Sequence, residues 1–409
     1  MSRAVVVPAA VCLLLVTLFP SAGADDLAAR AAKLHRRALV VDTHIDVPSR
    51  HFAEAHYNVG ERHSEGHVDL PRMREGGLDA GFFSIYLSAD ITGPEAVMRS
   101  LRLIDWTRRQ IERNSREAVI ATSAADVRRA HKQGRRAILM GMEGGHMIAD
   151  DLGVLRMYAA LGIRYLTLTH TRHTNWADSS GEDPRHNGLT EFGKEVVREL
   201  NRLGVMVDVS HVADKTFWDA LEVSRAPLVA SHSSCRALCN APRNMTDEMI
   251  KAMADKGGVI QITYVDAFLS QELRDAQEAV REERERRTRE IQERYPTDET
   301  ARREAMRQLS QELRTRMPKV SWEKIIEHIE HAVRVAGVDH VGLGSDFDGA
   351  TMPEGLEDCT RLPKIAEALL RKGYQERDIE KILGGNLLRV LEQAERVAQQ
   401  MRAAPGAAR

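Results

Sequence analysis

Apolar, strand-like runs that end in a histidine, aspartate or glutamate recur along the chain, and this recurrence constrains the fold more than any other feature. The first run, 39–46, ends in His44-Ile45-Asp46. Successive side chains of a strand alternate between its faces, so His44 and Asp46 point the same way, about 7 Å apart along the chain. A single pair of this kind is also typical of a hydrogen-bonded strand end. Its repetition favours a shared functional site.

Eight apolar, strand-like runs, six of which end in this way, alternate with amphipathic, helix-like segments. The alternation predicts βα units and a parallel sheet. Eight such units predict an α/β fold, the (β/α)8 TIM barrel. In this fold, functional groups gather at the carboxyl ends of the strands. A doubly wound open sheet is the alternative, but it gives no reason for polar groups at so many strand ends. We expect strands at 38–46, 78–87, 137–143, 165–170, 205–211, 228–232, 258–264 and 340–346, and helices that include 94–114, 150–161, 191–202 and 214–223.

The first 24 residues have the pattern of a secretory signal peptide. Arg3 precedes an apolar run over 4–19, and Ala22-Gly23-Ala24 forms a small-residue cleavage site. The run is short for a membrane span, which needs roughly 20 apolar residues; an uncleaved anchor is the alternative. We therefore expect a periplasmic or secreted protein without a stable membrane anchor, whose residues 25–409 form one metal-dependent barrel domain.

Charge and cysteine content narrow the class of partner. The formal net charge of −2 gives no basic surface of the kind that nucleic-acid binding requires. We therefore expect a small-molecule partner and no nucleic acid. Cys235, Cys239 and Cys359 follow the predicted leader. In an oxidising compartment they allow one disulfide and one free thiol, and the sequence leaves their pairing open.

An Arg- and Glu-rich stretch at about 271–319 departs from the alternation. Its residues favour helices, Pro296 marks a break, and the mixed charges support i,i+4 pairs. We predict two solvated helices inserted between the seventh and eighth strands. A hairpin on the side of the barrel is the favoured placement, with a lid over the site or a dimerisation arm as alternatives. The oligomeric state stays open, a homodimer included.

Five of the strand-end residues predict a metal centre. Nitrogen and oxygen ligands without thiolates suit Zn²⁺, with Mn²⁺ or Co²⁺ as alternatives. If Glu143 bridges two ions, His44 and Asp46 complete one set of three protein ligands. His211 and His232 complete the other set. A hydroxide between the two ions would then attack a carbonyl group, which indicates a hydrolase.

Two further strand-end residues are left for catalysis. Asp346, without a partner ligand, can transfer the proton of the attacking water, and His170 can stabilise an oxyanion. Taken singly, each could also have a structural role, as a polar residue with its hydrogen bonds made within the protein or as the cap of the next helix. Other histidines fall in charged helical stretches and are expected at the surface: His35, His131, His328 and His331.

Nine short motifs surround these residues in order along the chain. They are VDTHID (41–46), HVDLPRM (67–73), GMEG (141–144), LTLTH (166–170) with NWAD (175–178), DVSH (208–211), SHS (231–233), RN (243–244), GSDFDG (344–349) and GNLLRV (385–390). Together they resemble the membrane dipeptidase (renal dipeptidase) family of zinc peptidases, peptidase family M19, which is related to the amidohydrolases. The resemblance covers almost the whole chain after the leader, except the Arg- and Glu-rich stretch.

This resemblance implies a (β/α)8 barrel that holds two zinc ions and hydrolyses dipeptides. The five residues of the predicted metal centre match the family's ligands, with Glu143 bridging. His170 and Arg243 match substrate-binding positions, and Asp346 matches the acid/base. The guanidinium of Arg243 can pair bidentately with the terminal carboxylate of a dipeptide. The anchoring tail of the animal members is absent from this sequence.

We therefore predict an exported binuclear-zinc dipeptidase. Another amide or lactam hydrolase on the same barrel, such as an N-acyl amino acid hydrolase, is the nearest alternative. An exported protein that binds metal without catalysis is an alternative from another class.

Overall fold

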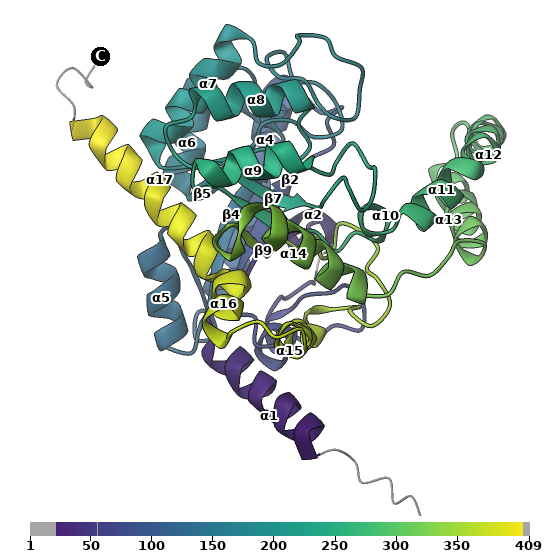
Figure 1. Cartoon of the computed structure of the whole chain (residues 1–409). Helices are drawn as coiled ribbons and strands as arrows, with labels where there is room; N and C mark the ends of the chain where they lie inside the picture. Colours follow the sequence, from purple (N-terminus) through teal and green to yellow (C-terminus); the bar gives the residue numbers. More distant parts are fainter. Residues whose placement is uncertain (1–21, 55, 404–409) are drawn as a thin grey trace, which may run out of the picture.

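The computed structural model describes residues 22–54 and 56–403, and its centre is a parallel β-sheet that curls into a barrel (Figure 1). Each neighbouring pair of strands along the barrel is parallel. All eight predicted strands are confirmed. In barrel order they are β1 (Val41–Ile45), β2 (Ala80–Tyr86), β4 (Arg136–Glu143), β5 (Ile163–Thr167), β6 (Met206–Asp208), β7 (Val229–Ser233), β8 (Val259–Ile262) and β9 (Val341–Leu343).

The barrel closes where β1 meets the chain that follows β9. The Asp46 backbone N–H donates to the Phe347 carbonyl at 2.7 Å, and the Asp346 N–H donates to the His44 carbonyl at 3.0 Å. Ile45 and Phe347 also form an isolated parallel bridge. The predicted (β/α)8 barrel is therefore confirmed, and the alternative of a doubly wound open sheet is wrong. The closing bonds lie at the carboxyl ends of both strands, so they bring His44, Asp46 and Asp346 together.

One additional strand, β3 (Ala118–Ile120), was not expected from the sequence. It pairs with β4 at residues 136–138. The pairing of β4 with β5 begins only at Met140, so β3 occupies the side of β4 that β5 leaves free. A run of three residues is too short to show the periodicity of a strand. The late start of β5 leaves room beside β4 for a strand of only this length.

Helices cover the outside of the barrel (Figure 1). The four predicted helical segments are confirmed as α4, α6, α7 and α8, and capping side chains define several starts; Thr190, for example, accepts a hydrogen bond from the Gly193 N–H at the start of α7. The helices outside the inserted stretch are α1 (Ala22–Arg37), α2 (Val47–His51), α3 (Leu70–Glu75), α4 (Gly93–Arg113), α5 (Ala124–Lys132), α6 (Leu152–Leu161), α7 (Glu191–Leu203), α8 (Asp214–Val223), α9 (Asp247–Asp255), α10 (Asp266–Leu269), α14 (Glu323–Ala336), α15 (Pro363–Arg371), α16 (Glu376–Glu380) and α17 (Asn386–Ala403).

The amino end of the barrel is closed by apolar packing. One buried cluster contains the first residues of five strands together with Leu387, Leu388 and Leu391 of α17. The Asn386 side-chain amide donates to the carbonyls of Val338 and Val341 at 2.7 and 2.8 Å, which fixes the start of α17 against β9. The polar strand ends therefore lie at the opposite, carboxyl end.

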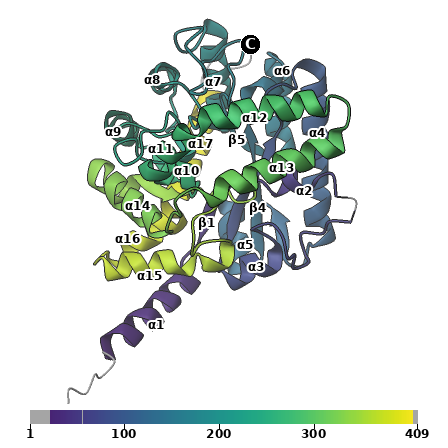
Figure 2. The same cartoon turned by 90° about the vertical axis from the view of Figure 1, so that its right-hand side faces the viewer.

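The Arg- and Glu-rich stretch forms three helices between β8 and β9, so the prediction of two helices was wrong. They are α11 (Gln271–Ala279), α12 (Arg281–Arg294) and α13 (Glu299–Thr315). The additional break is at Val280, where the backbone leaves the helical region, whereas the break near Pro296 is confirmed. Figures 1 and 2 place α12 and α13 beyond the carboxyl end of the barrel rather than along its flank.

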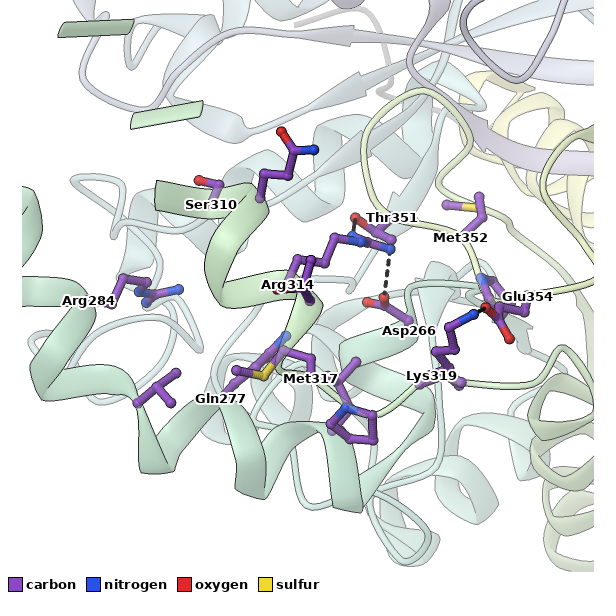
Figure 3. Close-up of a pocket in the computed structure, with 17 residues that line it drawn as sticks. Asp266, Gln277, Arg284, Ser310, Arg314, Met317, Lys319, Thr351, Met352 and Glu354 are labelled. Carbon is purple, nitrogen blue, oxygen red and sulfur yellow. Dashed lines mark hydrogen bonds and ion pairs between the residues drawn. The ribbon is translucent and has the colours of Figure 1, made fainter. Parts of the chain in front are cut away.

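The inserted helices contact the barrel through the loop after β9. A cavity of about 520 Å³ lies between them (Figure 3). Across it, Arg314 Nη1 donates to Thr351 Oγ1 at 2.7 Å and Arg314 Nη2 lies 3.8 Å from an oxygen of Asp266. The described part of α12 contains no buried residue, so this helix is held mainly by contacts with α13.

Two histidines expected at the surface are buried. His35 Nε2 lies 2.8 Å from the Gly76 carbonyl. His328 accepts the Cys235 N–H and donates to the Leu269 carbonyl. The helices α1 and α14 present these histidines to carbonyls at the ends of α3 and α10, and the helical pattern of the sequence alone does not reveal such partners. His131 and His331 are half-buried.

The remaining sequence predictions concern the thiols and the leader. Cys235, Cys239 and Cys359 are buried free thiols, so the disulfide that their number allows is not formed. Residues 1–21, which contain most of the predicted leader, lie outside the described residues. Within the described ranges, no helix combines the length and apolar character that a bilayer span requires.

Candidate metal centre and catalytic site

Glu143, the last residue of β4, lies at the centre of the site. Its Oε1 is 3.0 Å from His211 Nε2, 3.3 Å from His232 Nε2 and 3.5 Å from His170 Nε2. Its Oε2 is 3.4 Å from His44 Nε2. Four imidazoles from the ends of four strands thus surround one buried carboxylate, as the strand-end pattern predicts.

The other side of the site joins the first and last strands. His44 Nε2 lies 3.3 Å from Asp46 Oδ2, and the barrel closure brings Asp346 beside both. A Cβ added at Gly349 would overlap carboxylate oxygens of Asp46 and Asp346. The glycine of the GSDFDG motif therefore lets the backbone approach the two acids closely.

Among the described residues, three groups of side chains have ligand atoms within 4.8 Å of one another, which is close enough to hold a metal ion. These groups differ from the two ligand sets predicted from the sequence. His44 is grouped with His232 as well as with Asp46, and His170 is grouped with His211. All five predicted ligands, as well as His170 and Asp346, are members. The groups are His44, Glu143 and His232; Glu143, His170 and His211; and His44, Asp46 and Asp346.

The donor chemistry fits zinc. Imidazole nitrogens and carboxylate oxygens are zinc ligands. His44 Nε2 is buried and, among the described residues, has no hydrogen-bond partner. His211 Nε2 and His232 Nε2 approach to 2.9 Å. Imidazole nitrogens that converge in this way are ready to share a cation.

The ionisation of the site also favours a cation. Burial lowers the pKa of His211 and of His232 well below the usual range, so both stay in the neutral form that binds metals. Burial opposes the charge on Glu143, but the imidazoles, His44 first, hold the pKa of Glu143 well below its usual range. Burial likewise opposes a charge on His44, yet Tyr165, Glu143 and Asp46 raise its pKa well above the usual range. The carboxylates therefore favour positive charge here, from a proton or from a metal.

Asp346 differs from the other carboxyl groups. Burial raises its pKa well above the usual range, and the neighbouring charges of Asp46 and Glu143 add to the effect, although His44 opposes it. Its backbone has a φ of 66°, and that of His211 is 67°. Positive φ at non-glycine residues is uncommon and concentrates at functional sites.

Outer groups orient two of the imidazoles. The Tyr165 hydroxyl lies 2.8 Å from His44 Nδ1. Ser231 Oγ lies 2.9 Å from His232 Nδ1 and donates to Asp208 Oδ2 at 2.6 Å. Such contacts leave the Nε2 atoms free to face the centre of the site.

The ring of Tyr165 has room because Gly141 has no side chain; a Cβ there would overlap the ring. Tyr165 and Gly141 lie inside strands, on β5 and β4. A search for titratable strand ends therefore misses them.

A cavity of about 320 Å³ opens onto this centre. Five of its lining residues were not predicted as site residues: Ser49, Arg50, Tyr86, Asp348 and Gly349. Ser49 and Arg50 lie in α2, and Tyr86 ends β2 without being a histidine or an acid, which explains why they were missed. Asp348 was visible in the GSDFDG motif, two residues after Asp346.

Arg243 is placed less directly than the other predicted residues. The described residues that line the cavity do not include it. Its Nη2 donates to the His232 carbonyl at 3.0 Å, and its guanidinium lies 5.5 Å from the Phe268 ring centroid. Its Nε and Nη1 are buried and have no hydrogen-bond partner among the described residues. Burial lowers the pKa of Arg243 to about 10, so it stays charged at neutral pH.

Comparisons with known proteins give the family and the fold that the chain resembles. The profile of the family described as "Membrane dipeptidase (Peptidase family M19)" matches residues 28–405. Dipeptidase 3 of Macaca fascicularis is 34% identical over 388 residues, which cover 92% of this chain and 70% of that protein.

Solved structures are similar over most of the chain. The probable dipeptidase PvdM from Pseudomonas aeruginosa has a TM-score of 0.78 at 28% identity, covering 91% of this chain and 100% of that one. A metallo peptidase from Rhodobacter sphaeroides, liganded with a phosphinate mimic of the dipeptide L-Ala-D-Ala, has a TM-score of 0.72 at 28% identity, covering 87% of this chain and 99% of that one.

Proposed function

Since the chain belongs to the membrane dipeptidase family, peptidase family M19, we propose that it is an exported dipeptidase that holds two zinc ions and hydrolyses the peptide bond of dipeptides. The observation that carries the proposal is the central position of Glu143. Its Oε1 faces His211 and its Oε2 faces His44, at 3.0 and 3.4 Å. One carboxylate with a different imidazole at each oxygen suits a ligand shared by two ions.

The five ligands divide around Glu143. His44 and Asp46 would hold one ion, and His211 and His232 would hold the other. When bound, zinc supplies an activated water and a Lewis acid that polarises the scissile carbonyl.

The remaining groups move protons and orient the substrate. In its carboxylate form, Asp346 accepts a proton from the attacking water. Its raised pKa then favours delivery of this proton to the leaving nitrogen. Burial lowers the pKa of His170, so the neutral imidazole can donate a hydrogen bond to the carbonyl oxygen as negative charge develops there.

Arg243 supplies the substrate's anchor. Its two unpartnered nitrogens can bind the terminal carboxylate of a dipeptide. In a longer peptide an uncharged peptide bond occupies this place and leaves the buried guanidinium without an anion. The dipeptide mimic bound by the Rhodobacter sphaeroides relative supports a dipeptide as the substrate, and the leader-like residues 1–24 support a periplasmic or secreted location.

Metal content and turnover together test the proposal. We expect about two zinc ions per chain by elemental analysis and release of free amino acids from a panel of L,L and L,D dipeptides. Asp346→Asn should retain the metal and abolish turnover. Metal without turnover of any dipeptide by the wild type would contradict the substrate assignment. Cleavage of N-acyl amino acids or lactams in its place would identify a different amide hydrolase on the same barrel.

A further inference from the structure

The catalytic cavity contains a guanidinium that the mechanism above does not use. Arg50 lies in α2, beside the carboxyl end of β1, and lines the cavity together with Asp348 and Gly349. Its side chain is 41% exposed. Among the described residues that line this cavity, it is the only arginine or lysine.

None of the described acidic groups makes a hydrogen bond with the guanidinium of Arg50, although Asp348 Oδ2 is buried and has no partner among the described residues. Its one ionic contact with a described residue joins Nε to Asp348 Oδ1 at 3.7 Å, which is too long for a hydrogen bond. The same Asp348 oxygen accepts the His67 backbone N–H at 2.7 Å. Asp46 is assigned to the metal and Asp346 to proton transfer. The two terminal nitrogens of Arg50 therefore remain available to a ligand in the cavity.

The barrel order places Arg50 away from Arg243. Arg243 follows β7, whereas Arg50 follows β1, and β8 and β9 separate these strands on the shorter side of the barrel. With the terminal carboxylate at Arg243 and the scissile carbonyl near Glu143, as proposed above, the part of the cavity left for the first residue of the substrate includes the seam between β1 and β9. Arg50 and Gly349 line the cavity at this seam.

We propose that Arg50 selects dipeptides whose first residue carries an acidic side chain, aspartate or glutamate. The inference rests on the proposed dipeptidase function and specifies its substrate class. A guanidinium binds a carboxylate through two parallel charge-assisted hydrogen bonds, which an amide side chain of the same shape cannot replace.

The test compares Glu-Ala with Gln-Ala, two dipeptides that differ only in the charged end of the first side chain. We expect the wild type to show a kcat/KM about tenfold or more higher for Glu-Ala, the range of one charge-assisted contact. In Arg50→Gln this ratio should fall to about 1, and Arg50→Lys should keep part of it. Because the ratio is taken within each enzyme, a loss of folded protein cancels.

Arg172→Gln is the matched control, since Arg172 is an exposed arginine paired with Asp90 at 3.0 Å. It should keep the wild-type ratio. Equal turnover of both dipeptides by the wild type would refute the proposal. An equal loss for both in Arg50→Gln would also refute it, because Arg50 would then bind a group that the two dipeptides share. Failure of the metal-loaded wild type to cleave any dipeptide, Ala-Ala included, would instead overturn the dipeptidase function, and this inference with it.

Discussion

The buried imidazole of His328 gives the stability of the protein a pH dependence that one substitution can isolate. Its Nδ1 accepts the Cys235 N–H at 3.1 Å, and its Nε2 lies 3.1 Å from the Leu269 carbonyl, to which it donates. Because Nδ1 must accept, only the neutral ring fits. Burial lowers the pKa of His328 to about 4, compared with about 6.5 for an unfolded chain.

The sign and size of the effect follow from proton linkage. Between the two pKa values the unfolded state binds the proton and the folded state does not. The contribution of His328 is therefore fully present above about pH 6.5 and is lost as the pH falls towards 4. With these pKa values, His328 lowers the free energy of unfolding by about 2 kcal/mol between pH 7 and pH 5.

Urea unfolding of wild type and His328→Gln at pH 7 and pH 5 measures this contribution of His328 to the free energy of unfolding. A chelator keeps both proteins metal-free, so that acid release of metal does not contribute. Glutamine does not titrate but can still donate to the Leu269 carbonyl. At pH 7 we expect it to lower the free energy of unfolding by about 1–3 kcal/mol, because the Cys235 N–H loses its acceptor.

The decisive quantity is the difference in unfolding free energy between wild type and His328→Gln. This difference should fall by about 2 kcal/mol from pH 7 to pH 5 and so come close to zero. The exposed His56 provides the control, since His56→Gln should follow the wild type at both pH values. A difference between wild type and His328→Gln that does not change with pH would refute the reasoning.

Further predictions concern the metal centre and its support. Glu143→Gln should bind less than one zinc ion per chain by elemental analysis, because both ligand sets share this carboxylate; retention of two ions would contradict the bridging role. Tyr165→Phe removes the contact with His44 Nδ1 and should weaken zinc binding about 10–100-fold in a competition titration with a chelator, whereas unchanged affinity would show that packing alone orients His44. Gly141→Ala forces a methyl group into the Tyr165 ring and should cost about 1–3 kcal/mol in urea unfolding. Arg287→Ala removes an exposed ion pair with Glu312 and should cost less than about 1 kcal/mol by the same measurement.

The convergence of the candidate metal ligands could be predicted from the sequence because the rule that brings them together is local. A parallel strand that ends in a polar residue delivers that residue to the carboxyl end of the barrel, whatever the details of packing. Six of the eight predicted strands end in such a residue, and they include those that carry His44, Glu143 and His232. The eight predicted strands together indicated the barrel and the position of the insertion.

What the sequence missed depends on contacts between segments far apart in the chain. The short strand β3 exists because β5 begins late beside β4. The third inserted helix results from a break at Val280 that no proline or glycine marks. The burial of His328 depends on Cys235, 93 residues away.

The sequence by itself thus determined which residues reach the open end of the barrel, since strand direction and side-chain alternation are properties of each segment. Only the tertiary structure decided the ionisation of those residues and which other side chains line the cavity beside them. Burial and the closure of β1 against the chain after β9 set the ionisation of Asp346 and Glu143. The same closure turns Arg50 into a cavity residue, because charge and access in a folded protein depend on neighbours that local sequence does not specify.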